Sequence, residues 1–206
     1  MKPVIVGVVV AAGASTRMGR PKQLLEIGGR PLLQWVVDAA EASTLDQIVV
    51  VTGYAAEEVR AAVSLDRAVW AHNEEPERGT MSSLRAGLEV AGSADAVVKL
   101  VCDQPGVTSD LIDGVIGSWD PEMHRASLAS YRDGDGHPVL VAASALADVV
   151  DEDGDRRLWN VLETTPEGVS RFTADRPRPI DINTEEDLRV AAIQLGYDPS
   201  PAPPRA

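Results

Sequence analysis

Short apolar runs alternate in the first half of the chain with longer segments in which apolar residues recur every three or four positions. The apolar runs predict buried strands at residues 4–10, 48–52, 69–71 and 96–101. The segments between them predict helices at residues 31–40, 55–63, 82–91 and 109–118. Strands that alternate with helices are typical of a parallel sheet flanked by helices.

The second half of the chain departs from this alternation. Strand patterns at residues 127–131 and 138–141 flank the turn sequence of residues 133–136, which predicts an antiparallel hairpin. The remaining predicted elements are short helices at 145–150 and 157–163, strands at 169–173 and 179–182, and a last helix at 184–195. Gly196 would end that helix, and the four prolines of residues 197–206 predict a disordered tail. We therefore expect a single α/β domain over residues 1–196, Rossmann-like and three-layered, with a mostly parallel sheet and a small antiparallel hairpin insertion.

Composition narrows the class of protein. A chain of 206 residues with 44% hydrophobic residues is long and apolar enough for one domain with a full core. A net charge of -13 argues against a nucleic-acid-binding surface, and any phosphate site must be locally basic. The single cysteine, Cys102, excludes an intramolecular disulfide and fits a cytoplasmic location. No apolar run is long enough to span a bilayer, so we expect no membrane partner.

The loop after the first strand carries the densest chemistry. Small residues fill positions 11–15, and two cations, Arg17 and Lys22, follow closely. Small residues let the backbone approach a ligand, consecutive N–H groups can cradle an anion, and Arg and Lys bind phosphate oxygens. The segment predicts a polyphosphate clamp, although it matches neither the Walker A loop nor the dinucleotide fingerprint. The alternative is an ordinary turn between a strand and a helix.

Further polar residues follow other strands. Asp103 comes after the strand of residues 96–101, where a carboxylate beside a phosphate clamp would suit Mg²⁺, unless it only caps the loop before Pro105. Asp181 and Asn183 lie at the end of the last predicted strand, where either could complete a metal shell. The alternative is that Thr184 and Asn183 cap the helix that begins near Glu185. Because ligands bind beyond the carboxyl ends of the strands in such sheets, we expect residues 10–11, Asn73 and Asp103, each at or just after the end of a predicted strand, to share one crevice.

Several motifs, in order, resemble those of the MobA-like nucleotidyltransferases. Residues 10–22 resemble the family signature L-A-A-G-x-S-x-R-M-G-x-x-K, with Val10 in place of the leading Leu. Further matches are Asn73 with residues 79–88, residues 102–105, residues 136–139, and residues 181–188. Within the family the chain looks most like the molybdenum-cofactor cytidylyltransferases, and the resemblance implies the nucleotide-diphospho-sugar transferase type of fold.

The resemblance also implies roles for individual residues. Arg17, Lys22 and Asp103 would be catalytic, and Mg²⁺ would be held by Asp103 with Asn183 or Asp181. The second carboxylate of the family's D-x-D-T motif is Asn183 here, which leaves the second ligand open. The implied nucleotide-binding residues are Ala11, Ala12, Gly13, Ser15, Arg17, Lys22, Asn73, Gly79, Ser82 and Ser83. The implied acceptor-binding residues are Gln104, Pro105, Gly136, His137 and Pro138.

The implied reaction is attack of an acceptor phosphate on the α-phosphorus of a nucleoside triphosphate, with release of pyrophosphate. The Ala11-Ala12 pair favours CTP, because guanylyl-specific relatives usually read Gly-Gly there. The acceptor would be molybdopterin, and transient contact with a molybdoenzyme or a cofactor-delivery protein is a further expectation. Three alternatives remain: a sugar phosphate or other phosphorylated metabolite as acceptor, a non-catalytic nucleotide-binding accessory protein, and a Rossmann oxidoreductase.

Overall fold

The computed structural model of the chain describes residues 2–15, 19–150 and 166–198, together with Leu158 and Leu162. Arg17, most of the helix predicted at residues 157–163 and residues 199–206 of the predicted tail lie outside the described residues. The single-domain assignment to residues 1–196 therefore stays a prediction.

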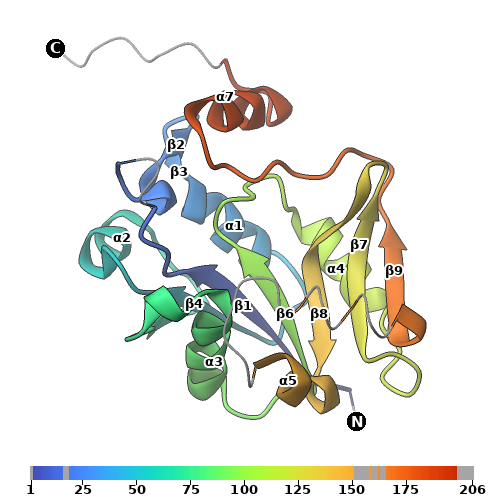
Figure 1. Cartoon of the computed structure of the whole chain (residues 1–206). Helices are drawn as coiled ribbons and strands as arrows, with labels where there is room; N and C mark the ends of the chain where they lie inside the picture. The colour runs from blue at the N-terminus through green and yellow to red at the C-terminus, as the bar shows by residue number, and fades with distance from the viewer. Residues whose placement is uncertain (1, 16–18, 151–157, 159–161, 163–165, 199–206) are drawn as a thin grey trace, which may run out of the picture.

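A seven-stranded sheet runs through the molecule in the order β5-β4-β1-β6-β8-β7-β9 (Figure 1). Its strands are β1 (Ile5–Ala11), β4 (Gln47–Thr52), β5 (Val69–His72), β6 (Ala96–Val101), β7 (Ala126–Tyr131), β8 (Gly134–Ala142) and β9 (Val169–Thr173). Strand β8 runs antiparallel to both of its neighbours, and the other pairs are parallel. The predicted mostly parallel sheet is confirmed, and the hairpin lies within it.

Helices cover both faces of this sheet. They are α1 (Leu32–Glu41), α2 (Ala56–Ala62), α3 (Thr80–Ala91), α4 (Ser109–Gly117), α5 (Ala143–Val150) and α7 (Glu185–Gln194), with 3-10 turns η2 (Lys22–Leu24), η3 (Pro76–Arg78) and η4 (Pro166–Gly168). Apolar residues of α1, α2 and α4 pack in one core with one face of the sheet, and those of α3 and α5 pack in a second core on the other. The three-layer prediction is thus confirmed. No helix in the described part of the chain is long and apolar enough to cross a bilayer.

A third, smaller core joins the two ends of the chain. It contains Leu25, Leu32, Ile182 and Ala191, and a two-stranded sheet, β2 (Glu26–Ile27) with β3 (Arg30–Pro31), borders it. The short strands β2 and β3 were not predicted, because two residues show no periodicity. The loop after β1, which is predicted to clamp phosphates, is called the clamp loop below. Helix α7 therefore packs on the segment that follows this loop, as Figure 1 also shows.

Several sequence expectations need correction. Residues 179–182 form no strand, because a proline has no N–H for a ladder and prolines stand at positions 177 and 179. The segment instead crosses above the carboxyl end of the sheet toward α7 (Figure 1). In the hairpin, Tyr131 pairs with Gly134, so the turn is the two residues 132–133 rather than residues 133–136. His137 and Pro138, joined by a cis peptide bond, lie in a bulge of β8 between the pairs Ala129–Gly136 and Leu128–Val139.

Tyr197, three residues beyond the end of α7, packs against an earlier part of the chain. Tyr197, predicted to begin the tail, packs its ring edge against Trp35 with ring centroids 5.6 Å apart. It covers Gly28, where a Cβ would collide with the tyrosine ring and where φ is +62°. Glycine at this position is therefore required by both the backbone and the space.

Candidate functional site

A cavity of about 310 Å³ opens beyond the carboxyl ends of β1 and β6. Four separate stretches of the chain meet there: the loop after β1, the start of α3, the loop after β6 and the segment before α7. Its lining residues are Val10, Gly13, Ser15, Lys22, Gln23, Thr80, Val101, Cys102, Asp103 and Asn183. Parallel strands end at the same edge of a sheet, and of the residues expected to share a crevice Val10 and Asp103 line this cavity, whereas Asn73 lines a second one.

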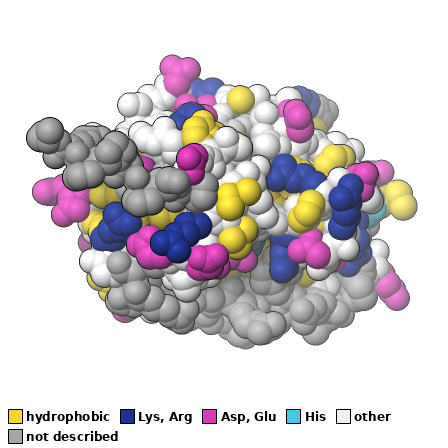
Figure 2. All heavy atoms as spheres, turned by 90° about the horizontal axis from the view of Figure 1, so that it is seen from above, with side chains coloured by type: hydrophobic (Ala, Val, Ile, Leu, Met, Phe, Trp, Pro, Cys, Tyr) yellow, Lys and Arg dark blue, Asp and Glu magenta, His cyan; other side chains and the backbone are white. Residues whose placement is uncertain are grey.

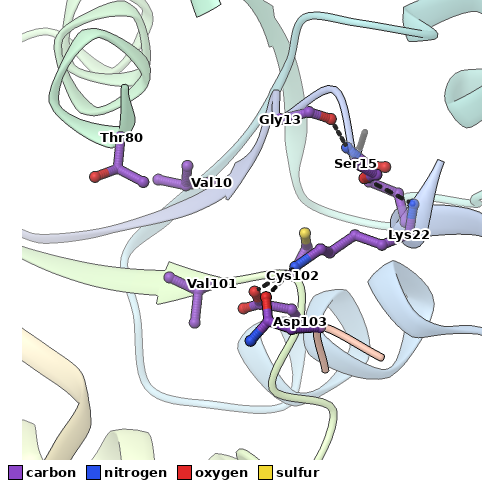
Figure 3. A pocket seen from close by; sticks show the side chains of 10 residues that line it. Val10, Gly13, Ser15, Lys22, Thr80, Val101, Cys102 and Asp103 are labelled. Carbon is purple, nitrogen blue, oxygen red and sulfur yellow. Dashed lines mark hydrogen bonds and ion pairs between the residues drawn. The ribbon is translucent and has the colours of Figure 1, made fainter. Parts of the chain in front are cut away.

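Lys22 connects three of these stretches. Its Nζ donates to Asp103 Oδ2 at 2.9 Å and to Asn183 Oδ1 at 3.2 Å, and Figure 3 shows the side chain extending toward Asp103. The Lys22 and Asp103 side chains are 17% and 23% exposed, so solvent screens this ion pair only partly. A carboxylate oxygen and an amide oxygen therefore converge on one cation.

This convergence also bears on metal binding. No group of three or more His, Cys, Asp or Glu side chains able to hold a metal occurs among the described residues. A divalent ion would thus depend on Asp103, on the carbonyl oxygen of Asn183, and on oxygens from phosphates and water. Mg²⁺ in phosphate sites takes this kind of donor set, so the residues present fit such an ion.

Asp181 is not among the residues that line this cavity, and its side chain interacts with Gln104. Gln104 Nε2 donates to Asp181 Oδ1 at 2.7 Å, and the Ile182 N–H donates to the Asp103 carbonyl at 3.0 Å. Desolvation raises the pKa of the Asp181 carboxyl, the Gln104 hydrogen bond opposes this, and the nearby Asp103 charge adds to it. Asp181 therefore remains beside Asp103 as the alternative second ligand.

The helix-cap interpretation of this segment is confirmed for Thr184. Thr184 Oγ1 accepts from the Asp187 N–H at 3.1 Å, and the Asp187 carboxylate accepts from the N–H groups of Thr184 and Asn183. This capping box satisfies the first amides of α7 and leaves the Asn183 side chain directed to Lys22.

Gln23 is a residue whose role the sequence does not reveal. Its side chain is fully buried, and its Nε2 donates to the carbonyls of Ala11 at 2.7 Å and Gly13 at 3.0 Å. The Lys22 N–H donates to Ser15 Oγ at 2.9 Å, so the clamp loop is fixed from two sides. A lone amide next to Leu24 and Leu25 is the only signal in the sequence, and it does not identify the partners.

Among the residues expected to bind nucleotide, Asn73, Ser82 and Ser83 form a buried hydrogen-bonded group near Gly79. Asn73 Nδ2 donates to Ser82 Oγ at 2.8 Å and to Ser83 Oγ at 3.0 Å, and Asn73 Oδ1 accepts from the Glu75 N–H. These bonds hold the loop before α3, in which Gly79 has φ of +91°. Asn73 and Ser82 also line a second cavity of about 290 Å³, and their contact with a nucleotide stays a prediction.

The residues expected to bind the acceptor are all buried: Gln104, Pro105, Gly136, His137 and Pro138. The His137 carbonyl accepts from the Tyr131 hydroxyl at 2.6 Å. Burial, and then the positive charges of Lys99 and Arg178, lower the pKa of the His137 imidazole well below its usual value. The imidazole is therefore uncharged at neutral pH and supplies no cation to an anionic acceptor.

Comparison with known proteins places these features in a family. Residues 7–169 match the MobA-like NTP transferase domain. Nicotine blue oxidoreductase of Paenarthrobacter nicotinovorans is 30% identical over 76% of this chain and 81% of its own. The bifunctional protein GlmU of Sorangium cellulosum is 36% identical over 56% of this chain. The match spans only about a quarter of the GlmU chain, 26%.

Solved structures of related proteins are similar to this fold over nearly the whole chain. The homologue of Mycobacterium tuberculosis Rv0371c from Mycobacterium sp. strain JC1 has a TM-score of 0.80 and 32% identity, covering 93% of this chain and 98% of its own. Rv0371c itself, solved in complex with manganese, has a TM-score of 0.79 and 29% identity, covering 92% and 98%. A divalent metal is therefore plausible for proteins of this family.

Proposed function

This chain belongs to the MobA-like NTP transferase family, and on that premise we propose that it is a Mg²⁺-dependent molybdenum-cofactor cytidylyltransferase. It would move CMP from CTP to the phosphate of a molybdopterin-type acceptor and release pyrophosphate. The observation that carries the proposal is the Lys22 ammonium held between Asp103 and Asn183 in a cavity at the carboxyl edge of the sheet. A cytoplasmic location, and transient contact with a molybdoenzyme or a cofactor-delivery protein, belong to the same proposal.

The nucleotide end of the site would be the clamp loop. Ala11 and Ala12 are buried, and Gly13 and Ser15 line the cavity, so the base and phosphates would meet small side chains and backbone. Ala11-Ala12 supports CTP over GTP by the family resemblance. Lys22 lines the same cavity, and together with Arg17 it would stabilise the negative charge that develops on pyrophosphate.

Asp103 and Asn183 would hold Mg²⁺, with Asp181 as the alternative to Asn183. When bound, the ion neutralises phosphate charge and orients the reacting oxygens. No residue of the chain has to act as a general base, because the acceptor phosphate is already ionised. The chain's contribution is to position two anionic substrates in line and to compensate their charge.

An oxidoreductase and a non-catalytic nucleotide-binding protein are the alternative functions, and measurements of ligand binding and turnover distinguish them from a cytidylyltransferase. A relative is named an oxidoreductase, which favours the nicotinamide alternative, whereas the G-x-G-x-x-G fingerprint is missing from this chain. A non-catalytic nucleotide-binding protein would bind nucleotide without turnover. The same residues would also serve transfer to a sugar phosphate, so the acceptor is the least constrained part of the proposal.

Calorimetric titration with CTP, GTP, ATP, UTP and NADPH, each with and without Mg²⁺, tests the proposal. We expect CTP to bind most tightly, only with Mg²⁺, and at least about tenfold more weakly in Asp103→Asn, since one charge-assisted contact is worth about 1.4 kcal/mol or more. Asp110→Asn, an exposed carboxylate on the first turn of α4, is the matched control and should bind CTP normally. Preference for GTP would overturn the base assignment, and binding of NADPH alone would overturn nucleotidyl transfer.

A further inference from the structure

Two arginines outside the motifs lie beside segments that hold residues expected to bind the acceptor. Arg176 and Arg178 belong to the segment that crosses from β9 to α7 above the carboxyl end of the sheet (Figure 1). A Cβ at Gly106, three residues after Asp103, would lie 3.6 Å from Arg176 Nη2. A Cβ at Gly136 would lie 2.8 Å from Arg178 Cδ. The two side chains therefore lie against the loop after β6 and against the β7–β8 hairpin.

Among the described residues, neither guanidinium forms a salt bridge with an acidic side chain, although the charge of Arg178 acts on Asp181. In the described part of the chain, the side chain of Arg178 makes one hydrogen bond, from Nη1 to the Asp135 carbonyl at 3.3 Å, and that of Arg176 makes no ion pair. Their neighbour Arg132 pairs with Asp175 at 2.7 Å. In a chain with a net charge of -13, two arginines two positions apart in sequence, neither in a salt bridge within the described residues, favour binding of an external anion.

Figure 2 looks down on the end of the molecule that holds the site. Lys and Arg side chains lie on its right, over the side where β7 and β9 lie, with Asp and Glu side chains among them, and further Lys and Arg side chains lie on the left. Burial raises the pKa of Tyr131 to about 12, and the charges of Arg176 and then Arg178 act against this rise. Both arginine charges therefore reach Tyr131, whose hydroxyl donates to the His137 carbonyl. The charges of Lys99 and then Arg178 also act on the uncharged His137 imidazole.

We propose that Arg176 and Arg178 form an anion subsite that binds the phosphate monoester of the acceptor beside the loop after Asp103. Two planar guanidinium groups can each bind two oxygens of a dianionic phosphate, whereas an uncharged alcohol offers them nothing equivalent. The inference rests on the proposed function and deepens it, because it assigns the residues that would hold the acceptor phosphate. It leaves the nucleotide to the clamp loop.

Binding of a simple phosphate monoester tests the subsite without the unidentified acceptor. Phenyl phosphate and phenol would be titrated into the full chain while the arginine Nε–H signals are followed by NMR. We expect phenyl phosphate to shift the signals of Arg176 and Arg178, assigned by their loss in the single Gln variants, and phenol to leave them unchanged. Phenyl phosphate should bind at least about tenfold more weakly to the Arg176→Gln/Arg178→Gln double variant.

Two matched variants sharpen the test. Arg132→Gln removes one charge from the same surface, but its guanidinium already pairs with Asp175, so binding should stay within about twofold. Arg178→Lys keeps the charge but loses the planar fork, and should recover only part of the affinity. Equal losses in Arg132→Gln and Arg178→Gln, or no loss in the double variant when its thermal unfolding is unchanged, would overturn the subsite.

The phosphate could instead belong to the nucleotide, and the Kd for CTP with Mg²⁺ separates the two sources. The inference requires that the double variant bind CTP as the unaltered chain does, while Asp103→Asn binds it weakly. Weaker CTP binding in the double variant would assign the arginines to the triphosphate and overturn the inference. If CTP binds to neither protein but phenyl phosphate still depends on both arginines, the proposed function fails and the anion subsite stands.

Discussion

At the scale of single residues, the site depends on a few side chains whose partners are far away in sequence. Lys22 and Asp103 can be predicted from the sequence, because a cation after a small-residue loop and a carboxylate after a buried strand suggest phosphate and metal chemistry. Their ion pair and the contact of Lys22 with Asn183 cannot, since 81 and 161 residues separate the partners. Gln23 escapes prediction for the same reason.

Replacing Gln23 tests whether it supports the loop. Gln23→Met keeps the length of the side chain but removes both hydrogen bonds to the Ala11 and Gly13 carbonyls. The two carbonyls would then lack this donor, so we expect unfolding free energy to fall by about 1–3 kcal/mol, with weaker CTP binding. Urea denaturation and calorimetry measure the two effects. Gln47→Met, at an exposed position, is the control, and equal stability in both variants would contradict the role of Gln23.

At the scale of elements, valine-rich runs predict the central strands because buried parallel strands read as continuous apolar segments. The apolar pattern wrongly predicts a strand at residues 179–182. It does not predict β2 and β3, because two residues are too few to show a period. The apolar pattern also does not predict that two aspartate side chains bind backbone N–H groups at the start of β1. The Val4 N–H donates to Asp95 Oδ2 at 2.7 Å and the Ile5 N–H to Asp46 Oδ2 at 2.9 Å.

Asp46 makes the stability of β1 dependent on pH. The hydrogen bond from Ile5, with a smaller part from Lys2, lowers the pKa of the Asp46 carboxyl below its usual value. A lowered pKa in the folded state contributes stability above the unfolded pKa of about 3.9, and that stability is lost as pH falls through the lower folded value. With solvent screening, Asp46→Asn should cost about 0.5–1 kcal/mol at pH 7. Urea denaturation should show this difference at about pH 7 and a smaller one near pH 3, and a difference that grows in acid would contradict the assignment.

At the scale of the whole molecule, the last part of the chain completes the structure. The composition and the strand–helix alternation predict one three-layer α/β fold, and the solved relatives agree. The sequence does not predict that α7 and Tyr197 pack on the segment from Leu25 to Trp35, because a proline-rich end indicates disorder when it is judged by composition alone.

Removing the Tyr197 ring tests whether it holds α7 against the segment from Leu25 to Trp35. Tyr197→Ala loses the edge contact with Trp35 and the cover over Gly28, so we expect a loss of about 0.5–1.5 kcal/mol in unfolding free energy. Amide hydrogen exchange should become faster in α7 and leave β1 unchanged. Tyr54→Ala, at a position that is 44% exposed, should change neither quantity. Unchanged exchange in α7 would show that Tyr197 does not hold the helix in place.

The segment from Ala174 to Asn183 also sets an order of events during synthesis. Strands β1, β4, β5 and β6 are complete by Val101, and β7 to β9 by Thr173. Asn183, Arg176 and Arg178 are translated only afterwards. The contact of Lys22 with Asn183 therefore cannot form before the residues of all seven strands have been translated, whereas the partner Asp103 is translated before β7, β8 and β9.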